Sequence, residues 1–467
     1  MTAQSPVTET TALYGSEAPS DQQRQAFREG SVPVAVYGMG KIGLPLSLVY
    51  AAVTGSVTGV DIDQQRVAAL NDGTNPFDHE PGLSKMLSEH VENGSFAATT
   101  DGEAAAADAR IHVLVVPTLI DESDDPDLSV LCAAVDTIRT GLDPGDVVFV
   151  ESTVPPGACE DVVAPRLTAG DRVLGEFGLA HCPERTASGH ALQDIRGSYP
   201  KIVGGIDAES GRVAELVYGE LTNNEVIRTA DARTAECVKL FEGVYRDVNI
   251  ALANELGQLT DELGIDVVEA IEAANTQPYC DILTPGAGVG GHCIPYYPYF
   301  LLDGVNDRAP LIRTAREVNE RMPGFVVEKL SDELAADGDS LRGATVALLG
   351  VAYRAGIPET RESPAVDIAH RLSRLGATVL AVDPILEELP EMPAEHVSLA
   401  TLESRDVDAM VLVTAHEEFQ SIDWSHFESD DSADAGKRRG IPVIDGRQAL
   451  DLSDTAHRQY TIGRGGG

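Results

Sequence analysis

The sequence predicts an α/β protein in which two doubly wound domains are joined by a helical central domain. Three observations predict this class: a glycine-rich turn between an early strand and helix, a long helical periodicity in the middle, and a second alternation of strands and helices after it. We place the boundaries at a disordered tail over 1–30, a first doubly wound domain over 31–225, the central domain over 226–325 and a second doubly wound domain over 326–467.

The first domain opens with a dinucleotide-binding fingerprint. The apolar run 32–37 ends in Gly38-Met-Gly-Lys-Ile-Gly43, and a helical stretch follows over 44–54. A second strand over 57–61 ends in Asp61, 18 residues beyond Gly43, where an acid accepts hydrogen bonds from the adenosine ribose. Together these features predict a Rossmann-type NAD site, and the acid disfavours NADP because it repels a 2′-phosphate.

Two further strands end in turns that carry hydroxyl groups. The strand over 111–116 is followed by Thr118, and the strand over 147–150 is followed by Thr153. Ligands of open parallel sheets bind beyond the carboxyl ends of the strands, so both threonines are candidates for the cofactor crevice. The alternative, for either threonine alone, is ordinary capping of a turn.

The central domain is predicted to contain a long amphipathic helix over 234–263, because apolar residues recur there every three or four positions. This helix carries Lys239 and Arg246, with Gly243 between them on the same stripe. Another helical stretch is predicted over 309–319. A helical middle of this kind is typical of a subunit interface, and we expect a homodimer.

The second doubly wound domain repeats the alternation, with strands over 344–350, 377–382, 409–413 and 441–444 and a helix from Ser363. Its first turn, Gly350-Val-Ala-Tyr-Arg354, lacks the full glycine fingerprint. A Rossmann-like domain without that fingerprint can hold a nucleotide diphosphate other than a dinucleotide, with Arg354 and Arg361 as phosphate or sugar partners.

The charge of the chain limits the classes of molecule that it can bind. The net charge is −41, from 75 acidic and 34 basic residues, of which only six are lysines. Such a surface repels nucleic acid and anionic membranes, so a phosphate ligand must be held by local arginines, lysines and helix N-termini. Strong self-repulsion is tolerated where salt is concentrated, because the Debye length falls to about 3 Å at 1 M, and we therefore expect a high-salt cytoplasm.

The cysteines and the chain's hydropathy favour a cytoplasmic protein. No apolar run approaches 18 residues, and residues 1–30 are too polar for a signal peptide. The six cysteines lack CxxC pairing, so we expect reduced thiols and no metal site. Four of them are expected to be small buried hydrophobes: Cys132, Cys159, Cys237 and Cys280.

Cys293 differs because it ends a glycine run, Gly286-Ala-Gly-Val-Gly-Gly-His-Cys293. A glycine-lined approach lets the backbone come close to a substrate, and a thiolate can attack a carbonyl carbon that hydride transfer has just exposed. Beside the dinucleotide fingerprint, this thiol makes a dehydrogenase with a covalent step the leading hypothesis.

Five motifs, in this order, resemble those of the UDP-sugar 6-dehydrogenases over residues 32–450. They are Val154-Pro-Pro-Gly157, His181-Cys-Pro-Glu-Arg185, Val238-Lys-Leu240 with Arg246-Asp-Val-Asn-Ile250, Gly290-Gly-His-Cys-Ile-Pro295 and Arg361-Glu-Ser-Pro364. The second and fourth motifs resemble the UDP-N-acetylhexosamine branch, with the manno configuration favoured. The resemblance implies an NAD-dependent four-electron oxidation of the sugar C6 alcohol to a carboxylate through a cysteine thiohemiacetal and thioester.

The same resemblance implies residue roles. Cys293 is the implied nucleophile, Lys239 stabilises the charge on the C6 oxygen, and Glu184 is the acid/base for thioester hydrolysis. The implied cofactor positions are Gly38, Gly40, Ile42, Gly43, Asp61, Arg66, Thr118 and Thr153. The implied nucleotide-sugar positions are Arg185, Thr186, Lys239, Arg246, Gly290, Tyr353, Arg354 and Arg361.

Several positions depart from the pattern of the resembled family. Gly243 stands where an asparagine is usual, and Tyr297 stands where an aspartate is usual. Gln277-Pro278-Tyr279 replaces His-Pro-Arg, and Arg354 replaces lysine. The alternatives are therefore a UDP-glucose 6-dehydrogenase and a nucleotide-sugar-binding protein with impaired turnover. A two-electron hydroxyacid dehydrogenase shares the first domain but needs neither Cys293 nor the last domain.

Overall fold

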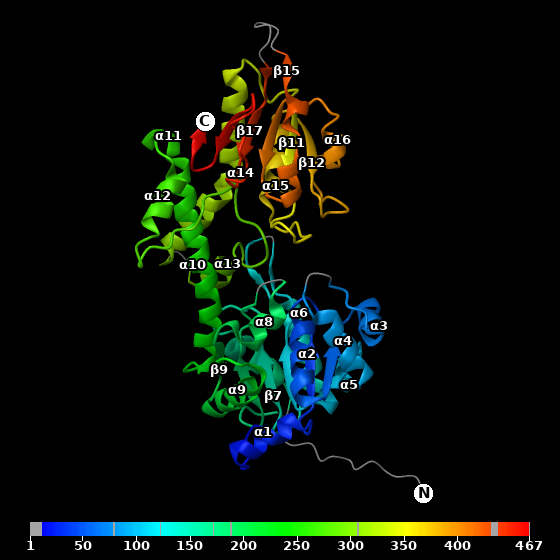
Figure 1. Cartoon of the computed structure of the whole chain (residues 1–467). Coiled ribbons are helices and arrows are strands. Elements are labelled where there is room, and N and C mark those ends of the chain that lie inside the picture. Colours follow the sequence, from blue (N-terminus) through cyan, green and yellow to red (C-terminus); the bar gives the residue numbers. More distant parts are fainter. Residues whose placement is uncertain are drawn as a thin grey trace. The chain divides into compact units, whose positions relative to one another are not determined.

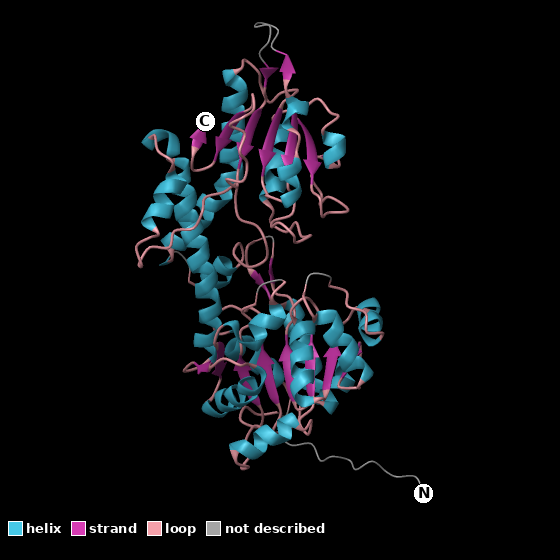
Figure 2. Cartoon of the chain, viewed as in Figure 1, coloured by secondary structure: helices cyan, strands magenta, loops and turns pink. Residues whose placement is uncertain are grey.

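The computed structural model describes residues 12–466, apart from 78–79, 122, 171, 187–188, 306–307 and 431–437. Its contacts divide the chain into two compact units, Met1–Phe241 with Tyr299–Asp303, and Glu242–Pro298 with Gly304–Gly467. Figure 1 labels the elements, and Figure 2 shows the strands of each unit as a layer flanked by helices. The predicted α/β class with two doubly wound sheets is confirmed.

The first unit contains an eight-stranded sheet with the order β10-β9-β8-β7-β4-β1-β2-β3. Neighbouring strands are parallel except β8 and β9, which pair antiparallel. Chain order reverses between β1 and β4, so the carboxyl ends of these two strands flank the crevice where such sheets bind ligands. The strands are β1 (Val34–Tyr37), β2 (Val57–Val60), β3 (Phe96–Thr99), β4 (Ile111–Leu114), β7 (Val147–Val150), β8 (Gly178–His181), β9 (Lys201–Gly205) and β10 (Val226–Arg228), and a small hairpin pairs β5 (Leu119–Ile120) with β6 (Pro126–Asp127).

Helices cover both faces of this sheet, which is why the central strands read as continuous apolar runs and are buried along their whole length. One hydrophobic cluster joins the sheet to α1, α2, α3, α4 and α9, and another joins it to α5, α6 and α7. The helices are α1 (Ser20–Arg28), α2 (Gly43–Thr54), α3 (Gln64–Asn71), α4 (Leu83–Glu92), α5 (Gly102–Asp108), α6 (Ser129–Gly141), α7 (Ala164–Leu167), α8 (Ala191–Gln193) and α9 (Ala208–Leu221), with π-helical turns η1 (Cys159–Val163) and η2 (Asp194–Ser198).

The prediction of a disordered tail over 1–30 is wrong for residues 12–30. Phe27 of α1 is fully buried and Leu13 is 1% exposed, so this segment belongs to the core of the first unit. Arg24 and Arg28 both pair with Glu220 of α9, which holds α1 on the domain. The polar composition concealed two apolar anchors. Residues 1–11 of the predicted tail lie outside the described residues.

The long central helix, α10 (Ala232–Gln258), contributes residues to both units and confirms the helix predicted over 234–263, with a break before α11 (Thr260–Leu263). The residues of α10 that are buried are not, for the most part, the apolar residues whose spacing predicted the helix. Phe241 is 57% exposed and Leu252 is 47% exposed, whereas Lys239 is 6% exposed. The buried residues of α10 are therefore mostly small or polar, apart from Leu240 and Val244, and much of the apolar stripe faces outward.

The second unit contains a seven-stranded sheet with the order β13-β12-β11-β14-β17-β18-β19, parallel except between β18 and β19. Hydrophobic clusters again cover both faces. Its strands are β11 (Thr345–Leu349), β12 (Thr378–Val382), β13 (Glu395–His396), β14 (Ala409–Leu412), β17 (Pro442–Asp445), β18 (Arg458–Thr461) and β19 (Gly465–Gly466), and β15 (Ser429–Asp430) pairs with β16 (Arg438–Arg439). Its helices are α11, α12 (Val267–Ala274), α14 (Pro310–Ala336), α15 (Pro364–Arg374) and α16 (Leu399–Leu402), with 3₁₀ turns η4 (Glu417–Ser421) and η5 (Trp424–Phe427); α13 (Tyr297–Leu302) is divided between the units.

The helix predicted over 309–319 is longer than expected, because α14 continues through Pro323 to Ala336. A buried polar network joins it to α10 within the second unit. Arg316 pairs with Asp247 at 2.5 Å, and the amide of Asn319 donates to the same carboxylate at 2.8 Å. Among the described helices, none combines the length and the apolar character that crossing a membrane requires.

Candidate active site

The turn between β1 and α2 has the geometry that the glycine fingerprint predicts. Gly38 adopts φ 100°, and a Cβ there would lie 2.4 Å from the Val115 carbonyl oxygen. A Cβ at Gly43 would lie 1.8 Å from the Gly38 carbonyl oxygen, so Gly43 permits the tight turn into the helix. A Cβ at Gly40 meets nothing within 4 Å, which leaves the backbone open to a ligand. Ile42 immediately precedes the helix.

Asp61 lies at the end of β2 beside this turn, as predicted. Its carboxylate accepts a hydrogen bond from the Met39 N–H at 2.9 Å and pairs with Arg66 at 2.9 Å. The structure thus brings the acid and Arg66 together. The next residue, Ile62, is 94% exposed, a degree of exposure unusual for isoleucine. The sequence did not single out Ile62 as an exposed residue beside the cofactor turn, because one apolar residue after a strand forms no pattern.

Thr118 and Thr153 also meet, at the carboxyl ends of β4 and β7. The Thr118 hydroxyl donates to the Thr153 carbonyl oxygen at 2.6 Å. Ser152 ties the same two turns together, because its hydroxyl donates to the Val116 carbonyl oxygen at 2.7 Å and accepts from the Val116 N–H at 3.0 Å. The capping alternative holds for Thr118, whose hydroxyl stabilises the turn. Both threonines lie at the edge of the sheet where ligands bind, and their contact with the cofactor stays a prediction.

Glu184 and Lys239 form a nearly buried ion pair in the first unit. The Lys239 Nζ lies 3.0 Å from Glu184 Oε2 and also donates to the Glu184 carbonyl oxygen. Burial on its own raises the pKa of Glu184, but the Lys239 charge and hydrogen bonds from Thr186 outweigh it and leave the pKa below its usual value. Glu184 is therefore a carboxylate at neutral pH, able to accept a proton. Arg185 lies over the Tyr199 ring and donates to the Pro200 carbonyl oxygen at 2.9 Å.

A polar cluster that the sequence did not reveal holds the backbone before Glu184. The Lys201 Nζ donates to the carbonyl oxygens of Cys182 at 2.8 Å and of Pro183 at 3.2 Å. The same ammonium pairs with Glu151 at 2.8 Å, and the Tyr218 hydroxyl donates to Glu151 as well. These contacts fix the strand end that carries Glu184. The scarcity of lysine in the chain is the one feature of the sequence that could have indicated a specific role for Lys201.

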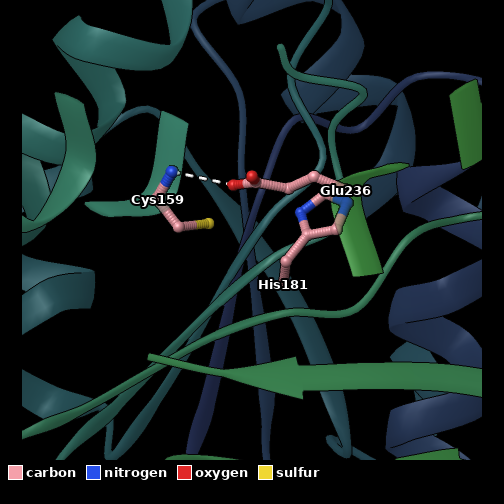
Figure 3. Close-up of side chains that lie close together, drawn as sticks. All are labelled: Cys159, His181 and Glu236. Carbon is pink, nitrogen blue, oxygen red and sulfur yellow. Dashed lines mark hydrogen bonds between the residues drawn. The ribbon is translucent and has the colours of Figure 1, made fainter. Parts of the chain in front are cut away.

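Cys159, His181 and Glu236 lie close together in the first unit (Figure 3), and each offers one ligand-type atom within 4.8 Å of the others. The Glu236 carboxylate accepts the N–H groups of Cys159 at 2.8 Å and of Gly157 at 2.5 Å, where η1 begins. Burial, with the charges of two nearby lysines, lowers the pKa of His181 to about 3, and burial raises the pKa of Cys159. The carboxylate is thus engaged by backbone donors and the nearby lysine charges oppose a dication, so these contacts favour a structural role for the cluster.

In the second unit, the loop that carries Cys293 lies on the segment 353–362. The Gly291 N–H donates to the Arg361 carbonyl oxygen at 2.9 Å. A Cβ at Gly290 would lie 2.8 Å from the Tyr353 Cβ, so only glycine permits this approach. His292 pairs with Glu359 at 3.0 Å. The Cys293 side chain itself is exposed, which distinguishes it from the buried Cys159 and Cys182.

The predicted nucleotide-sugar residues are divided between the units: Arg185, Thr186 and Lys239 belong to the first, and Arg246, Gly290, Tyr353, Arg354 and Arg361 to the second. Arg354 and Arg361 are exposed at the two ends of the segment that contacts the Cys293 loop, and Arg246 is exposed on α10. Glu362, next to Arg361, adopts φ 50° and accepts a hydrogen bond from the Tyr296 hydroxyl at 3.1 Å. A non-glycine residue with positive φ is often found at functional sites.

In the second sheet, the turn that follows β11 is hydrogen-bonded to an acidic side chain at the end of the neighbouring strand. Asp383 follows β12 as Asp61 follows β2, and its carboxylate accepts the N–H groups of Val351 and Ala352, each at 2.8 Å. Burial opposes ionisation, but these bonds and a contact with His416 lower the pKa of Asp383 to about 2. Asp61 binds one N–H group of the first turn, whereas Asp383 binds two N–H groups of this one.

We expect Asp383→Asn to lower the free energy of unfolding at neutral pH by about 2 kcal/mol. A carboxylate whose pKa is lowered by folding stabilises the folded state at any pH above its pKa in the unfolded chain. That stabilisation is lost as the pH falls from about 4 toward 2, so the Tm values of parent and variant should converge over this interval. Calorimetry at constant salt measures the difference. A gap that stays constant down to pH 2 would contradict the assigned contacts.

Comparisons with known proteins identify the class to which these features belong. Three family models match, all described as the UDP-glucose/GDP-mannose dehydrogenase family: its NAD binding domain over 32–222, its central domain over 233–321 and its UDP binding domain over 347–452. The chain belongs to this family. It is an NAD-dependent oxidoreductase, and the prediction of NAD as the cofactor is confirmed.

Individual relatives cover nearly the whole chain. A UDP-N-acetyl-D-mannosamine dehydrogenase from Pyrococcus horikoshii is 36% identical over 434 residues, which are 92% of this chain and 99% of that protein. A solved structure of the UDP-D-ManNAc dehydrogenase from the same organism matches with a TM-score of 0.84 over 93% of this chain and 100% of that one, at 36% identity. An NDP-N-acetyl-D-galactosaminuronic acid dehydrogenase from Ralstonia nicotianae is 37% identical over 409 residues, 85% of this chain and 93% of that protein.

Proposed function

We propose that the protein oxidises C6 of a UDP-N-acetylhexosamine, with UDP-N-acetylmannosamine favoured, to the uronic acid. The observation that carries this proposal is that the chain holds both chemical parts of the reaction. The first unit has the Lys239–Glu184 ion pair, and the second has the exposed Cys293 thiol on a loop that contacts Tyr353 and Arg361. The manno configuration is favoured because several relatives that match most of the chain act on that sugar by name.

The proposed steps balance as one alcohol, two NAD⁺ and one water giving one carboxylate, two NADH and three protons. NAD, when bound, accepts one hydride from C6 in each oxidation. Lys239 stabilises the charge on the C6 oxygen, and the Cys293 thiolate adds to the aldehyde carbon. After the second hydride transfer Glu184 takes a proton from water, which attacks the thioester and releases the thiol.

The cofactor site is assigned to the residues of the β1–α2 turn with Asp61, Arg66, Thr118 and Thr153. The nucleotide sugar is assigned to Arg185, Thr186, Lys239, Arg246, Gly290, Tyr353, Arg354 and Arg361. Three exposed arginines in the second unit supply positive charge in a chain of net charge −41, which supports their role with a diphosphate.

A panel of UDP-sugars tests the proposal directly. NADH release in high salt should be largest with UDP-N-acetylmannosamine, and mass spectrometry should identify the uronate. The panel includes the gluco and galacto N-acetyl sugars and UDP-glucose. The galacto sugar belongs in it because a relative from Ralstonia nicotianae acts on that configuration by name. UDP-glucose as the best substrate would overturn the N-acetylhexosamine assignment and leave the oxidation itself standing.

We expect Asp61 to make NAD preferred over NADP at least tenfold in kcat/KM, equivalent to about 1.4 kcal/mol or more. Asp61→Ser should narrow the gap, because it removes the negative charge and releases Arg66 to bind a 2′-phosphate. Adding Arg66→Gln to that variant should abolish the gain with NADP. Equal use of both cofactors by the parent would contradict the placement of Asp61 at the ribose.

The assembly and setting are proposed on separate grounds. We propose a homodimer in a high-salt cytoplasm. The exposed apolar residues Phe241, Tyr245 and Leu252 on one face of α10 support the dimer, since a second copy would bury them. Light scattering in high salt measures the mass of the assembly.

We keep the domain assignment 31–225, 226–325 and 326–467 as a proposal beside the matched family segments.

A further inference from the structure

Gly243 is a glycine in the interior of a long helix, and its backbone conformation does not explain it. Residues inside α10 adopt ordinary helical geometry, where glycine is less stable than alanine. The explanation lies in the neighbouring side chain. A Cβ at Gly243 would lie 2.1 Å from Cδ2, 2.9 Å from Cγ and 3.0 Å from Cβ of Tyr297. The Tyr297 ring therefore occupies the space of any side chain at 243.

The same tyrosine is bound to the backbone of Cys293. The Tyr297 N–H donates to the Cys293 carbonyl oxygen at 2.9 Å, and the Tyr296 N–H donates to the same oxygen at 3.2 Å. Tyr297 is 9% exposed, so its side chain is almost fully packed. One turn of backbone thus links the ring on Gly243 to the residue that carries the thiol.

The Cys293 turn is held on two sides within the second unit. On one side, Gly291 and Tyr296 are bound to the segment 353–362 through Arg361 and Glu362. On the other side, the Tyr297 ring contacts α10 at Gly243. A thiol that must reach a carbon between two hydride transfers needs a fixed backbone, because small displacements of reacting groups are costly.

We propose that Tyr297 is a positioning residue for Cys293 and that Gly243 is retained because its missing side chain accommodates the Tyr297 ring. The proposal rests on the proposed function. It makes the two departures from the resembled family a single change: a side chain at 243 and an aromatic ring at 297 exclude each other. It also counts against loss of turnover as the reason for the departures, because each substituted residue fits the other.

The test is a double-mutant cycle with Gly243→Ala, Tyr297→Ala and the pair combined, together with the conservative Tyr297→Phe. Gly219→Ala in α9 is the matched control, because Gly219 is also inside a helix but a Cβ there meets only the end of the Arg24 side chain, at 3.4 Å. Three quantities are measured: Tm, hydrogen exchange of the peptide over 290–298, and the rates of the first and second NADH formed per sugar.

Gly243→Ala should speed exchange in this peptide and slow the second oxidation about 10- to 100-fold, with the first oxidation little changed. When Tyr297→Ala is already present, adding Gly243→Ala should slow the second oxidation no further. Tyr297→Phe should exchange hydrogen and turn over as the parent does. A rise in Tm after Gly243→Ala, with exchange and the second oxidation unchanged as in Gly219→Ala, would overturn the proposal. If the parent oxidises no UDP-sugar, the proposed function fails, and exchange with Tm still decides whether the two residues are coupled.

Discussion

Cys293→Ser is expected to release one NADH per sugar and then stall, whereas the parent should release two. The serine hydroxyl is not ionised near neutral pH, so it cannot add to the aldehyde as a thiolate does. The second oxidation should fall on the order of 10³-fold or more, which is the scale on which loss of a nucleophile acts. NADH absorbance with a limiting amount of sugar gives the stoichiometry, and mass spectrometry separates aldehyde, enzyme-bound ester and uronate.

Cys280→Ser provides a matched control for this experiment. Cys280 is also in the second unit, but it is half-buried and its thiol contacts the Asn275 side-chain oxygen at 3.4 Å. Both NADH molecules should still form in this variant. Two NADH from Cys293→Ser at the parental rate would rule out the covalent route, as would one NADH and free aldehyde from the parent.

Local features of the cofactor half were predictable from the sequence because they follow from short-range geometry. The turn from Gly38 to Gly43 and the acid at Asp61 are fixed by a strand, a tight turn and the next strand in the chain. Their spacing is therefore visible in one dimension. The same holds for Thr118 and Thr153, since they follow β4 and β7, two neighbouring parallel strands of the sheet.

The supporting contacts were not predictable, because their partners are far apart in sequence. Lys201 binds Glu151, 50 residues earlier, and it carries no motif that announces this role. Gly243 and Tyr297 were both recognised as departures, but their contact appears only when α10 and α13 are placed in space. The apolar stripe of α10 predicted the helix correctly, but much of that stripe is exposed, because periodicity shows which residues share a face and not what covers the face.

Lys239→Met is expected to slow the first oxidation about 10²- to 10³-fold, the usual effect of removing one donor to a developing oxyanion. The same change leaves the nearly buried Glu184 carboxylate without its cation, at a cost of about 3 kcal/mol in stability at neutral pH. The Lys239 charge is the largest of the effects that lower the pKa of Glu184, so its removal leaves burial opposed only by the hydrogen bonds from Thr186 and should raise that pKa relative to the parent.

Because the unpaired Glu184 carboxylate costs stability only when it is ionised, the Tm deficit of Lys239→Met should shrink as the pH falls through the Glu184 pKa of the variant. Adding Glu184→Gln removes the unpaired charge and should restore most of the Tm at neutral pH without restoring turnover. This combination separates the two roles of the ion pair. A double variant as unstable as Lys239→Met, or one that recovers the first oxidation, would show that Glu184 and Lys239 are not coupled as the 3.0 Å contact indicates.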